Sequence, residues 1–343
     1  METNRQQLPF ISIVVLSYNQ QNFIADCIDS VLSQQYDGEL EIIFCDDCST
    51  DETFEIIQKK VASTPCPHHV ITHKCPQNGK VAVCMNTAVA LSSGDWIMRV
   101  DGDDILHPDR VRLSAAAILK HPGAIAVSGQ LTAFSNTPPP VQNPPPDQLQ
   151  YLVADKSQMA SHKKPAGLQW WGGVMTMSRR IFTEFGELPP VCNVLDDTMF
   201  ATRTLMLGQF VIILNATLLY YRRHGGNISS QTDTNQHSGF FNILKQDKAA
   251  RDYYRRGLPC HAPILGELQT YTASHPEAQS LLDFFRTYFD NMRRHALFWD
   301  KSWCQRIQDA HIQGGVLHKI PHALSVLCPL TYAFSIRIKQ LFK

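Results

Sequence analysis

Between residues 10 and 128, short apolar runs alternate with segments whose apolar residues recur every three or four positions. Five apolar runs, several rich in β-branched residues, predict strands. They cover residues 10–16, 41–45, 70–72, 96–100 and 124–128. The amphipathic segments between them predict helices at 23–32, from 51 onward, at 80–92 and at 109–120. Strands separated by helices form parallel βαβ units, so we predict an α/β fold with a mainly parallel sheet, covered on both faces.

The pattern changes after residue 128. Residues 137–146 contain six prolines, which remove backbone donors and fix φ, so we expect a stiff surface loop beside the acceptor side of the site. Residues 168–222 mix strand and helix patterns, and from about residue 231 the pattern is predominantly helical. We therefore predict a domain at 8–230, with halves at 8–128 and 129–230, followed by a helical C-terminal extension at 231–343.

Composition narrows the class of protein. The 343 residues include 31 Lys and Arg and 31 Asp and Glu, so no global basic field favours nucleic acid as a partner. A signal-peptide pattern is absent from the N-terminal residues, and no run of about 20 apolar residues is present. Ten cysteines without secretory features indicate reduced thiols in the cytoplasm. We expect a cytoplasmic protein that is not anchored by a spanning helix.

The C-terminal tail leaves two interpretations open. The last 43 residues carry six Lys and Arg and one Asp, and residues 323–336 are apolar apart from a few polar positions and one proline. Such a segment fits an amphipathic anchor on the cytoplasmic face of an anionic membrane. It equally fits an ordinary terminal helix docked on its own domain, which we favour slightly.

A cluster of carboxylates follows the strand predicted at 96–100. Asp101, Asp103 and Asp104 surround Gly102 at the point where this strand ends. Ligands of open α/β sheets bind at the carboxyl ends of the strands, and hard divalent cations prefer oxygen ligands. The cluster fits a metal and diphosphate site, and it also fits a polar turn with aspartates as helix caps. Spacing alone does not separate the two.

Polar motifs also follow the other strands, and their order is specific. Leu-Ser-Tyr-Asn closes the first strand at 16–19, and Cys-Asp-Asp-Cys-Ser-Thr-Asp closes the second at 45–51. Asn-Gly-Lys at 78–80 and Gly-Asp-Trp at 94–96 come before the acidic cluster. With these motifs the chain resembles family 2 of the glycosyltransferases, inverting enzymes of the GT-A fold, over roughly residues 10–230.

The resemblance implies a donor site for a nucleotide-diphosphate-sugar such as a UDP-sugar. Tyr18 would stack on the base, Asp47, or Asp46 beside it, would accept the base N–H, and Lys80 belongs to the same site. Asp103 would bind a divalent metal, Mn or Mg, and Asp101 would orient the ribose or the metal shell. Asp104 is expected to hold the metal-binding residues in place from behind, or to cap the helix predicted from residue 109.

A second acidic pair and a basic segment complete the predicted site. In similar enzymes, an acidic pair that opens a helix supplies the catalytic base, here Asp197; this chain has Asp196 where the family usually has Glu. A plain helix cap is the alternative. The Tyr-Arg-x-His segment of the family corresponds to residues 221–224, so Arg222 or Arg223 would neutralise the diphosphate and His224 would lie near the metal. The rings of Trp170 and Trp171 suit stacking against a sugar ring, and they equally suit burial in the core or at an interface.

Two cysteine patterns raise the question of redox or zinc chemistry. Cys45 and Cys48 have the spacing of a redox or zinc pair, but they bracket the predicted base-binding aspartates, so we treat them as incidental. Another group gathers Cys and His around a predicted strand whose side chains alternate between faces, which disfavours structural zinc. Its members are Cys66, His68, His69, His73 and Cys75.

The sequence thus predicts a metal-dependent glycosyltransferase of the hexosyltransferase type, acting on a glycan or lipid-linked acceptor in cell-surface polysaccharide synthesis. Two other classes remain. A nucleotidyltransferase would release pyrophosphate rather than a nucleoside diphosphate. A catalytically degenerate binding or assembly subunit would not need both Asp103 and Asp197.

Overall fold

The computed structural model describes residues 7–159, 168–225, 227, 240–297 and 300. The chain divides into two units. The first comprises Met1–Arg223 and Ala262–Phe285, and the second His224–His261 and Arg286–Lys343.

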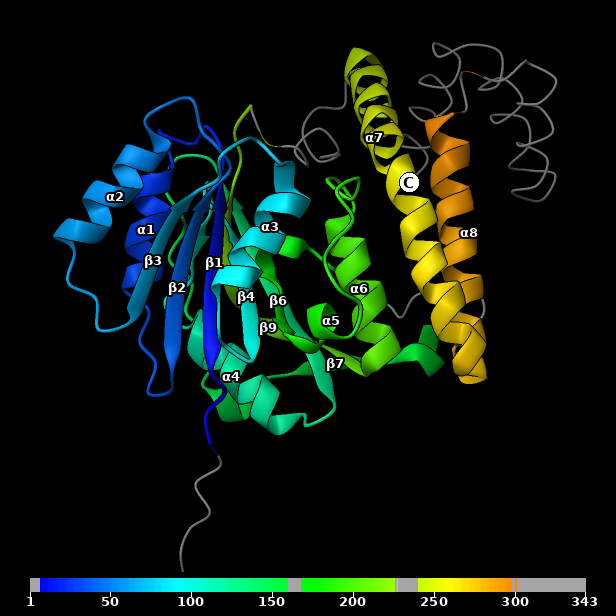
Figure 1. Ribbon diagram of the computed structural model, residues 1–343, viewed down its shortest axis with the longest axis horizontal. Coiled ribbons are helices and arrows are strands. Elements are labelled where there is room, and N and C mark those ends of the chain that lie inside the picture. The colour runs from blue at the N-terminus through cyan, green and yellow to red at the C-terminus, as the bar shows by residue number, and fades with distance from the viewer. Residues whose placement is uncertain (1–6, 160–167, 226, 228–239, 298–299, 301–343) are drawn as a thin grey trace, which may run out of the picture. The chain divides into compact units, whose positions relative to one another are not determined.

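The sheet of the first unit begins with the strands predicted from the apolar runs (Figure 1). They are β1 (Ile11–Ser17), β2 (Leu40–Asp46), β3 (His69–Lys74) and β4 (Trp96–Asp101). These four pair in parallel in the order β3-β2-β1-β4. The chain therefore leaves all four at one edge of the sheet, and the order reverses beside β1, where ligands of such folds bind.

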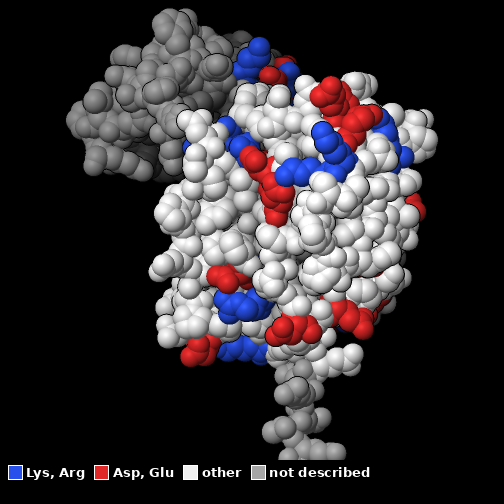
Figure 2. Space-filling model, turned by 90° about the vertical axis from the view of Figure 1, so that its left-hand side faces the viewer, with Lys and Arg blue, Asp and Glu red and all other residues white. Residues whose placement is uncertain are grey.

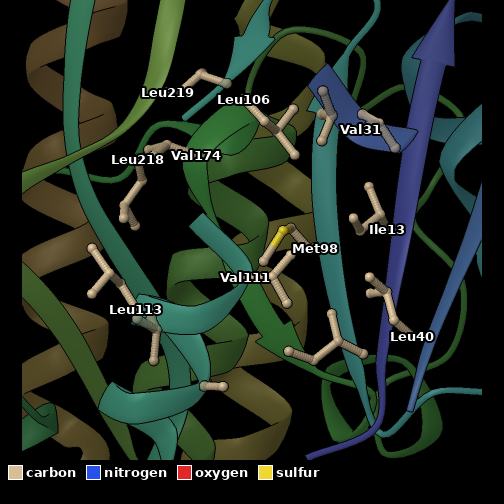
Figure 3. Close-up of a cluster of buried hydrophobic side chains, with 14 of the residues drawn as sticks. Ile13, Val31, Leu40, Met98, Leu106, Val111, Leu113, Val174, Leu218 and Leu219 are labelled. Carbon is tan, nitrogen blue, oxygen red and sulfur yellow. The ribbon is translucent and has the colours of Figure 1, made fainter. Parts of the chain in front are cut away.

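The helices between these strands are those that the amphipathic spacing predicts. They are α1 (Ile24–Leu32), α2 (Thr53–Ser63), α3 (Lys80–Leu91) and α4 (Arg110–Lys120). The buried side of α1 is formed by residues three and four positions apart, among them Ile24, Ile28 and Val31. Side chains such as Ile13 of β1, Met98 of β4 and Val111 of α4 gather in one apolar cluster (Figure 3). Burial of this cluster drives the association of sheet and helices.

The second half of the sheet mixes directions. The strands β8 (Thr176–Ser178), β6 (Ala124–Phe134), β9 (Gln209–Arg222) and β5 (Ile105–Leu106) continue the order beyond β4, and β7 (Tyr151–Ala154) pairs with β9. β6 and β9 are parallel, whereas β8, β5 and β7 pair antiparallel with their neighbours. Short helices α5 (Arg180–Thr183) and α6 (Asp196–Leu207) precede β9. The predicted α/β fold with a mainly parallel sheet is confirmed.

The proline-rich loop has no regular structure before the short 3₁₀ helix at Pro146–Gln148, as predicted. None of its residues is buried and half of them are exposed, but two contacts fix it. The amide of Asn143 exchanges two hydrogen bonds of 2.8 Å with the backbone of Thr217, and the Val141 carbonyl lies 3.0 Å from the His107 ring. Its place beside an acceptor remains a prediction.

Two long helices follow β9: α7 (Phe240–Ser274) and α8 (Gln279–Ala296). Within the first unit, the Glu267 carboxylate accepts two hydrogen bonds from the fully buried Arg203 of α6, and the Tyr271 hydroxyl donates to the Met206 carbonyl. In the second unit, the His261 ring stacks on Phe289 and Arg255 pairs with Asp300. The predicted helical extension is present, and its boundary at residue 230 stays a prediction.

The tail beyond residue 300, for which the sequence left a docked terminal helix or membrane contact open, lies outside the described residues. Among the helices that are described, none combines the length and the apolar character needed to cross a bilayer. On the face shown in Figure 2, basic and acidic side chains are intermixed near the top and the bottom, and the area between them is largely uncharged.

Candidate active site

The register of the sheet brings the predicted strand-end motifs side by side. Leu16 of β1 pairs with Asp101 of β4, and Ser17 pairs with Asp46 of β2. Tyr18 follows directly and is 45% exposed, so its ring is available to a ligand. Asn19 has a positive φ of 52°, which asparagine tolerates better than most residues, and its side-chain oxygen accepts a hydrogen bond from the Thr50 amide. The first two strand ends are thus joined.

The two aspartates after β2 have different surroundings. Asp46 is fully buried, and its carboxylate accepts hydrogen bonds from the Ser49 hydroxyl (2.5 Å), the Ser49 amide (2.8 Å) and the Ser17 hydroxyl (3.2 Å). Asp47 accepts a 2.8 Å hydrogen bond from the Gly79 amide, just before Lys80. Burial raises the pKa of Asp47, and the backbone amides of Gly79 and Lys80 oppose that shift. Asp46 holds the turn, and Asp47 links it to the start of α3.

The acidic cluster lies at the end of β4, against β1. The Gly102 amide donates to the Leu16 carbonyl (2.9 Å), and a Cβ at Gly102 would lie 2.5 Å from the Gln20 side-chain oxygen. Only glycine fits this approach without displacement. The Asp101 side chain is 37% exposed, whereas Asp103 and Asp104 are buried. Burial, with the charges of Asp103 and Asp101, raises the pKa of Asp104 well above its ordinary value.

Two buried arginines lie against this cluster. The Arg222 backbone amide donates to the Asp104 carboxylate (2.9 Å), and its guanidinium donates to the Asp103 carbonyl and to Asp26. The same guanidinium lies over the Phe134 ring at 4.7 Å. Arg110 is fully buried and donates to the Arg99 carbonyl (2.7 Å). Burial lowers the pKa of Arg110 to about 10, although Asp104 and Asp101 oppose this, so it is still a cation at neutral pH.

Arg99 connects the acidic cluster at the end of β4 with the acidic pair Asp196 and Asp197. Its guanidinium donates to Asp101 at 2.9 Å and to Asp196, the first residue of α6. Burial alone would lower the pKa of Arg99, but the charges of Asp101 and Asp196 raise it above its ordinary value. This ion pair holds the start of α6 beside the end of β4, 95 residues away along the chain from Asp101 to Asp196.

Asp197 lies at this junction and is half-buried. One carboxylate oxygen accepts a hydrogen bond from the Thr198 amide (2.6 Å), whereas the N-cap of α6 is Leu195, with no side-chain cap. Burial and the neighbouring Asp196 raise the pKa of Asp197 to about 7, against the lowering effect of Arg99. A carboxylate with such a pKa takes up and releases a proton near neutral pH, which suits a general base.

The segment at 171–173 covers the junction. A Cβ at Gly172 would lie 2.1 Å from the Arg99 guanidinium, and one at Gly173 would lie 3.0 Å from the Asp101 carboxylate. Trp171 is 41% exposed, whereas Trp170 is buried and its ring lies 6.1 Å from that of Phe285. Of the two predicted tryptophans, Trp170 is part of the core, and Trp171 is available beside the acidic residues.

The remaining predicted residues lie at the edges of this arrangement. Lys80 is exposed at the start of α3, with φ of 62°. The Arg223 amide donates to the Phe134 carbonyl at the end of β9. His224 opens the second unit, where its amide donates to the Asn227 side chain (2.6 Å). Its relation to Asp103 therefore remains a prediction.

Sequence reasoning assigned no role to Arg99 or Arg110. Arg99 reaches Asp196, and Arg110 reaches the Arg99 carbonyl, only in the folded chain, so no linear motif records these contacts. A basic residue two positions before the acidic cluster, within an otherwise apolar strand, was the only available signal for Arg99.

The comparisons with known proteins identify the class. The family model "Glycosyl transferase family 2" matches residues 12–182, and the chain belongs to this family of glycosyltransferases. Chondroitin synthase of Pasteurella multocida (strain Pm70) is 35% identical over 119 residues, which make up 35% of this chain and 12% of that protein. The match therefore covers a small part of that relative.

The fold has solved counterparts. The crystal structure of S. aureus TarS 1-349 in complex with UDP superposes with a TM-score of 0.58, covering 97% of this chain and 91% of that one at 14% identity. At that identity the likeness shows the fold, which is GT-A. By sequence, the poly(ribitol-phosphate) beta-N-acetylglucosaminyltransferase TarS of Staphylococcus aureus (strain Mu50) is 28% identical over 111 residues, 32% of this chain and 19% of that protein.

Proposed function

We propose that this glycosyltransferase moves a sugar from a nucleotide-diphosphate-sugar, most simply a UDP-sugar, to a hydroxyl of a glycan or lipid-linked acceptor, with inversion at the anomeric carbon. The observation that carries the proposal is the bridge of Arg99 between Asp101 and Asp196. It joins Asp101, a carboxylate suited to a metal, to Asp196, the residue directly before the proposed base Asp197. The names of the relatives, which include a chondroitin synthase and TarS, support a role in cell-surface polysaccharide synthesis.

We call the region around Tyr18, Asp46, Asp47 and Lys80 the donor corner, and we propose that it binds the nucleotide of the donor. Tyr18 offers an exposed ring for the base, and Asp47 offers a carboxylate held by the Gly79 amide. The Asp46 carboxylate already accepts three hydrogen bonds, so we assign it the role of stabilising the turn. We assign to Asp47 the role of accepting a hydrogen bond from the base N–H. The Arg222 guanidinium is packed between Phe134 and Asp26, so we assign diphosphate contact to Arg223 and Lys80.

The carboxylates fit a hard divalent cation. Asp101, Asp103, Asp104 and Asp196 outnumber the guanidinium groups of the buried arginines beside them, and burial with like charges raises the pKa of Asp104. Such an excess of oxygen ligands matches Mn or Mg. Asp103 and Asp101 would hold the ion. The bound ion supplies positive charge to the departing nucleoside diphosphate.

The chain's own groups carry out the rest of the reaction. Arg99 pairs with Asp196, the Thr198 amide donates to the Asp197 carboxylate, and both contacts fix the start of α6. Asp197 takes the proton of the acceptor hydroxyl as the oxygen attacks the anomeric carbon. The exposed Trp171 supplies an aromatic face for the acceptor or donor sugar.

Two substitutions test the proposal. Asp197→Asn should reduce transfer by about 100-fold or more while donor affinity stays within about twofold of the parent, because a lost general base costs about 10²–10⁴ in rate. Asp103→Ala should instead weaken metal-dependent donor binding. Calorimetry with UDP-sugar and Mn measures binding, and product analysis measures free nucleoside diphosphate.

Glu184→Gln, on the exposed end of α5, serves as a control that should change neither quantity. Near-normal turnover of Asp197→Asn would contradict the base assignment. Release of pyrophosphate would indicate a nucleotidyltransferase, and absence of any nucleotide-sugar binding would indicate a binding subunit.

A further inference from the structure

Three thiols meet behind the donor corner, outside the residues assigned to the reaction. Cys45 is on β2, Cys75 follows β3 and Cys84 is on α3. Their sulfur atoms all lie within 4.8 Å of one another, and the sulfurs of Cys45 and Cys75 are 3.8 Å apart. All three side chains are at most 5% exposed. No linear motif records this set, because α3 supplies its third member.

The three thiols belong to the elements that form the donor corner. Cys45 directly precedes Asp46, and the Cys75 amide donates to the Asp46 carbonyl (2.8 Å). Four residues after Cys75, the Gly79 amide donates to Asp47. The Cys84 thiol donates to the Cys45 carbonyl (3.5 Å). Anything that links the three sulfurs would therefore link β2, the end of β3 and α3.

The spacing of the sulfurs fits a metal ion. Metal–thiolate bonds are about 2.3 Å long, so an ion at the centre of three sulfurs holds them about 4 Å apart. Soft thiolate ligands favour soft cations such as Cu(I) and Zn. A structural zinc site closes with four ligands, and within the described part of the chain this group contains three. Three sulfurs in an apolar setting fit a three-coordinate soft cation better.

Solvent can reach the group at one of its three sulfurs. The residues that follow Cys75, at 76–78, are exposed, which gives an entry path to the least buried sulfur.

We propose that Cys45, Cys75 and Cys84 form a binding site for one soft cation of the Cu(I) class, which ties together β2, β3 and α3 beneath the donor corner. Binding releases the thiol protons to solvent and leaves each sulfur bound to the ion. The site is separate from the hard-cation site at Asp101 and Asp103, because carboxylates and thiolates select different ions. The proposal does not depend on the sugar-transfer reaction.

Cu(I) titration of the full, reduced chain under anaerobic conditions, in competition with a chromogenic Cu(I) chelator, tests the proposal. We expect one tightly held Cu(I), a sulfur-to-copper charge-transfer band in the ultraviolet, and a Tm raised by several degrees. Cys84→Ser and Cys75→Ser should each weaken Cu(I) binding by about 100-fold or more and abolish the rise in Tm. Cys48→Ser and Cys66→Ser, which alter thiols outside the group, should keep all three signals.

Circular dichroism of each metal-free variant establishes that the variant is folded, and Cys75→Ala provides a second substitution at the least buried position. Equal Cu(I) affinity in the Cys75 variants and in the parent would overturn the proposal. So would binding of Zn(II) in preference to Cu(I) at these sulfurs, or a Cys45–Cys75 disulfide that forms in air while the reduced chain holds no copper.

Discussion

Asp197 is the residue whose protonation should control the pH dependence of the reaction. Burial and Asp196 raise its pKa to about 7, and only the carboxylate form accepts a proton from the acceptor. We therefore predict that kcat/KM rises with pH up to about 7 and falls about tenfold for each pH unit below it. A profile of kcat/KM between pH 5 and 9 measures this, and a flat profile down to pH 5 would contradict the assignment.

The same shift has the opposite effect on stability. A carboxyl whose pKa is higher in the folded state binds more protons when folded, so its contribution to stability decreases as pH rises from about 4 to about 7. The asparagine of Asp197→Asn does not ionise, so it does not lower the stability of the fold as pH rises. The variant should therefore be more stable than the parent at pH 8 and closer to it at pH 5, as measured by denaturant unfolding at both values.

Arg99 should act through Asp197 as a positioning residue. Its charge lowers the pKa of Asp197, and its guanidinium bridges Asp101 and Asp196. Arg99→Gln should shift the midpoint of the kcat/KM profile to higher pH and reduce the activity at pH 7. Arg99→Lys should shift the midpoint less, because it keeps the charge but loses the fork-shaped contact.

Arg112→Gln removes an exposed arginine of α4 and should leave the pH profile unchanged. Because loss of one partner from a buried ion pair costs about 3–5 kcal/mol, the Arg99 variants need assay temperatures at which unfolding curves show them to be folded. A reduced rate with an unmoved pH midpoint would indicate a purely structural role for Arg99.

At the scale of residues, the sequence predicted kinds of side chain better than their partners. The strand-end motifs located Tyr18, Asp47 and the acidic cluster, because polar residues after apolar strands gather at one edge of the sheet. The different surroundings of Asp46 and Asp47 were not predictable. They depend on Ser17 and Gly79, which approach these carboxylates only in the folded chain.

At the scale of elements, periodicity predicted β1 to β4 and the helices α1 to α4, since short strands alternate there with amphipathic helices. The two-residue strand β5 was missed, because Ile105–Leu106 carries no periodicity and pairs with β9 only through tertiary packing. The cysteine group was missed for a similar reason, since its members come from three elements.

The turn after β4 gives a prediction for a matched pair of glycines. A Cβ at Gly102 would meet Gln20 and Ile24, so Gly102→Ala should destabilise the fold by about 1–3 kcal/mol and weaken donor binding. Gly266 of α7 has nothing within 4 Å of the corresponding position. Gly266→Ala should therefore stabilise the fold by about 0.5–1 kcal/mol, since glycine in a helix interior is less stable than alanine.

Denaturant unfolding of both glycine variants measures these changes, and calorimetry with UDP-sugar and Mn measures donor binding. Gly266→Ala also controls for any general effect of an added methyl group. Equal stability of the two variants would contradict the close approach of Gly102 to α1.

At the scale of the whole molecule, the first unit includes residues far beyond the predicted boundary at residue 230. Residues 262–285 belong to it, and they supply Glu267 to Arg203 and the Tyr271 hydroxyl to the Met206 carbonyl. The helical pattern after residue 231 predicted helices but not this contact, because amphipathic spacing does not name the surface on which a helix packs. We infer that the predicted boundary does not delimit an independently stable domain.

The Arg203–Glu267 pair allows a direct test with point variants. Arg203 is fully buried and also donates to the carbonyls of Ile181, Gly186 and Glu187, so loss of its carboxylate partner leaves a buried cation without its counter-charge. Glu267→Gln should destabilise the protein by about 3–5 kcal/mol. Glu277→Gln breaks the exposed pair with Lys156 and should change stability little.

The same reasoning predicts the behaviour of truncated chains. A fragment that ends at residue 230 lacks Glu267 altogether, and the resulting loss is a large part of the roughly 5–15 kcal/mol that stabilises a typical domain. This fragment should unfold at much lower denaturant concentration than one that ends at residue 300, or fail to fold. If the two fragments unfold at the same concentration, residues 262–285 do not stabilise the α/β unit, and the boundary predicted from the sequence is the correct one.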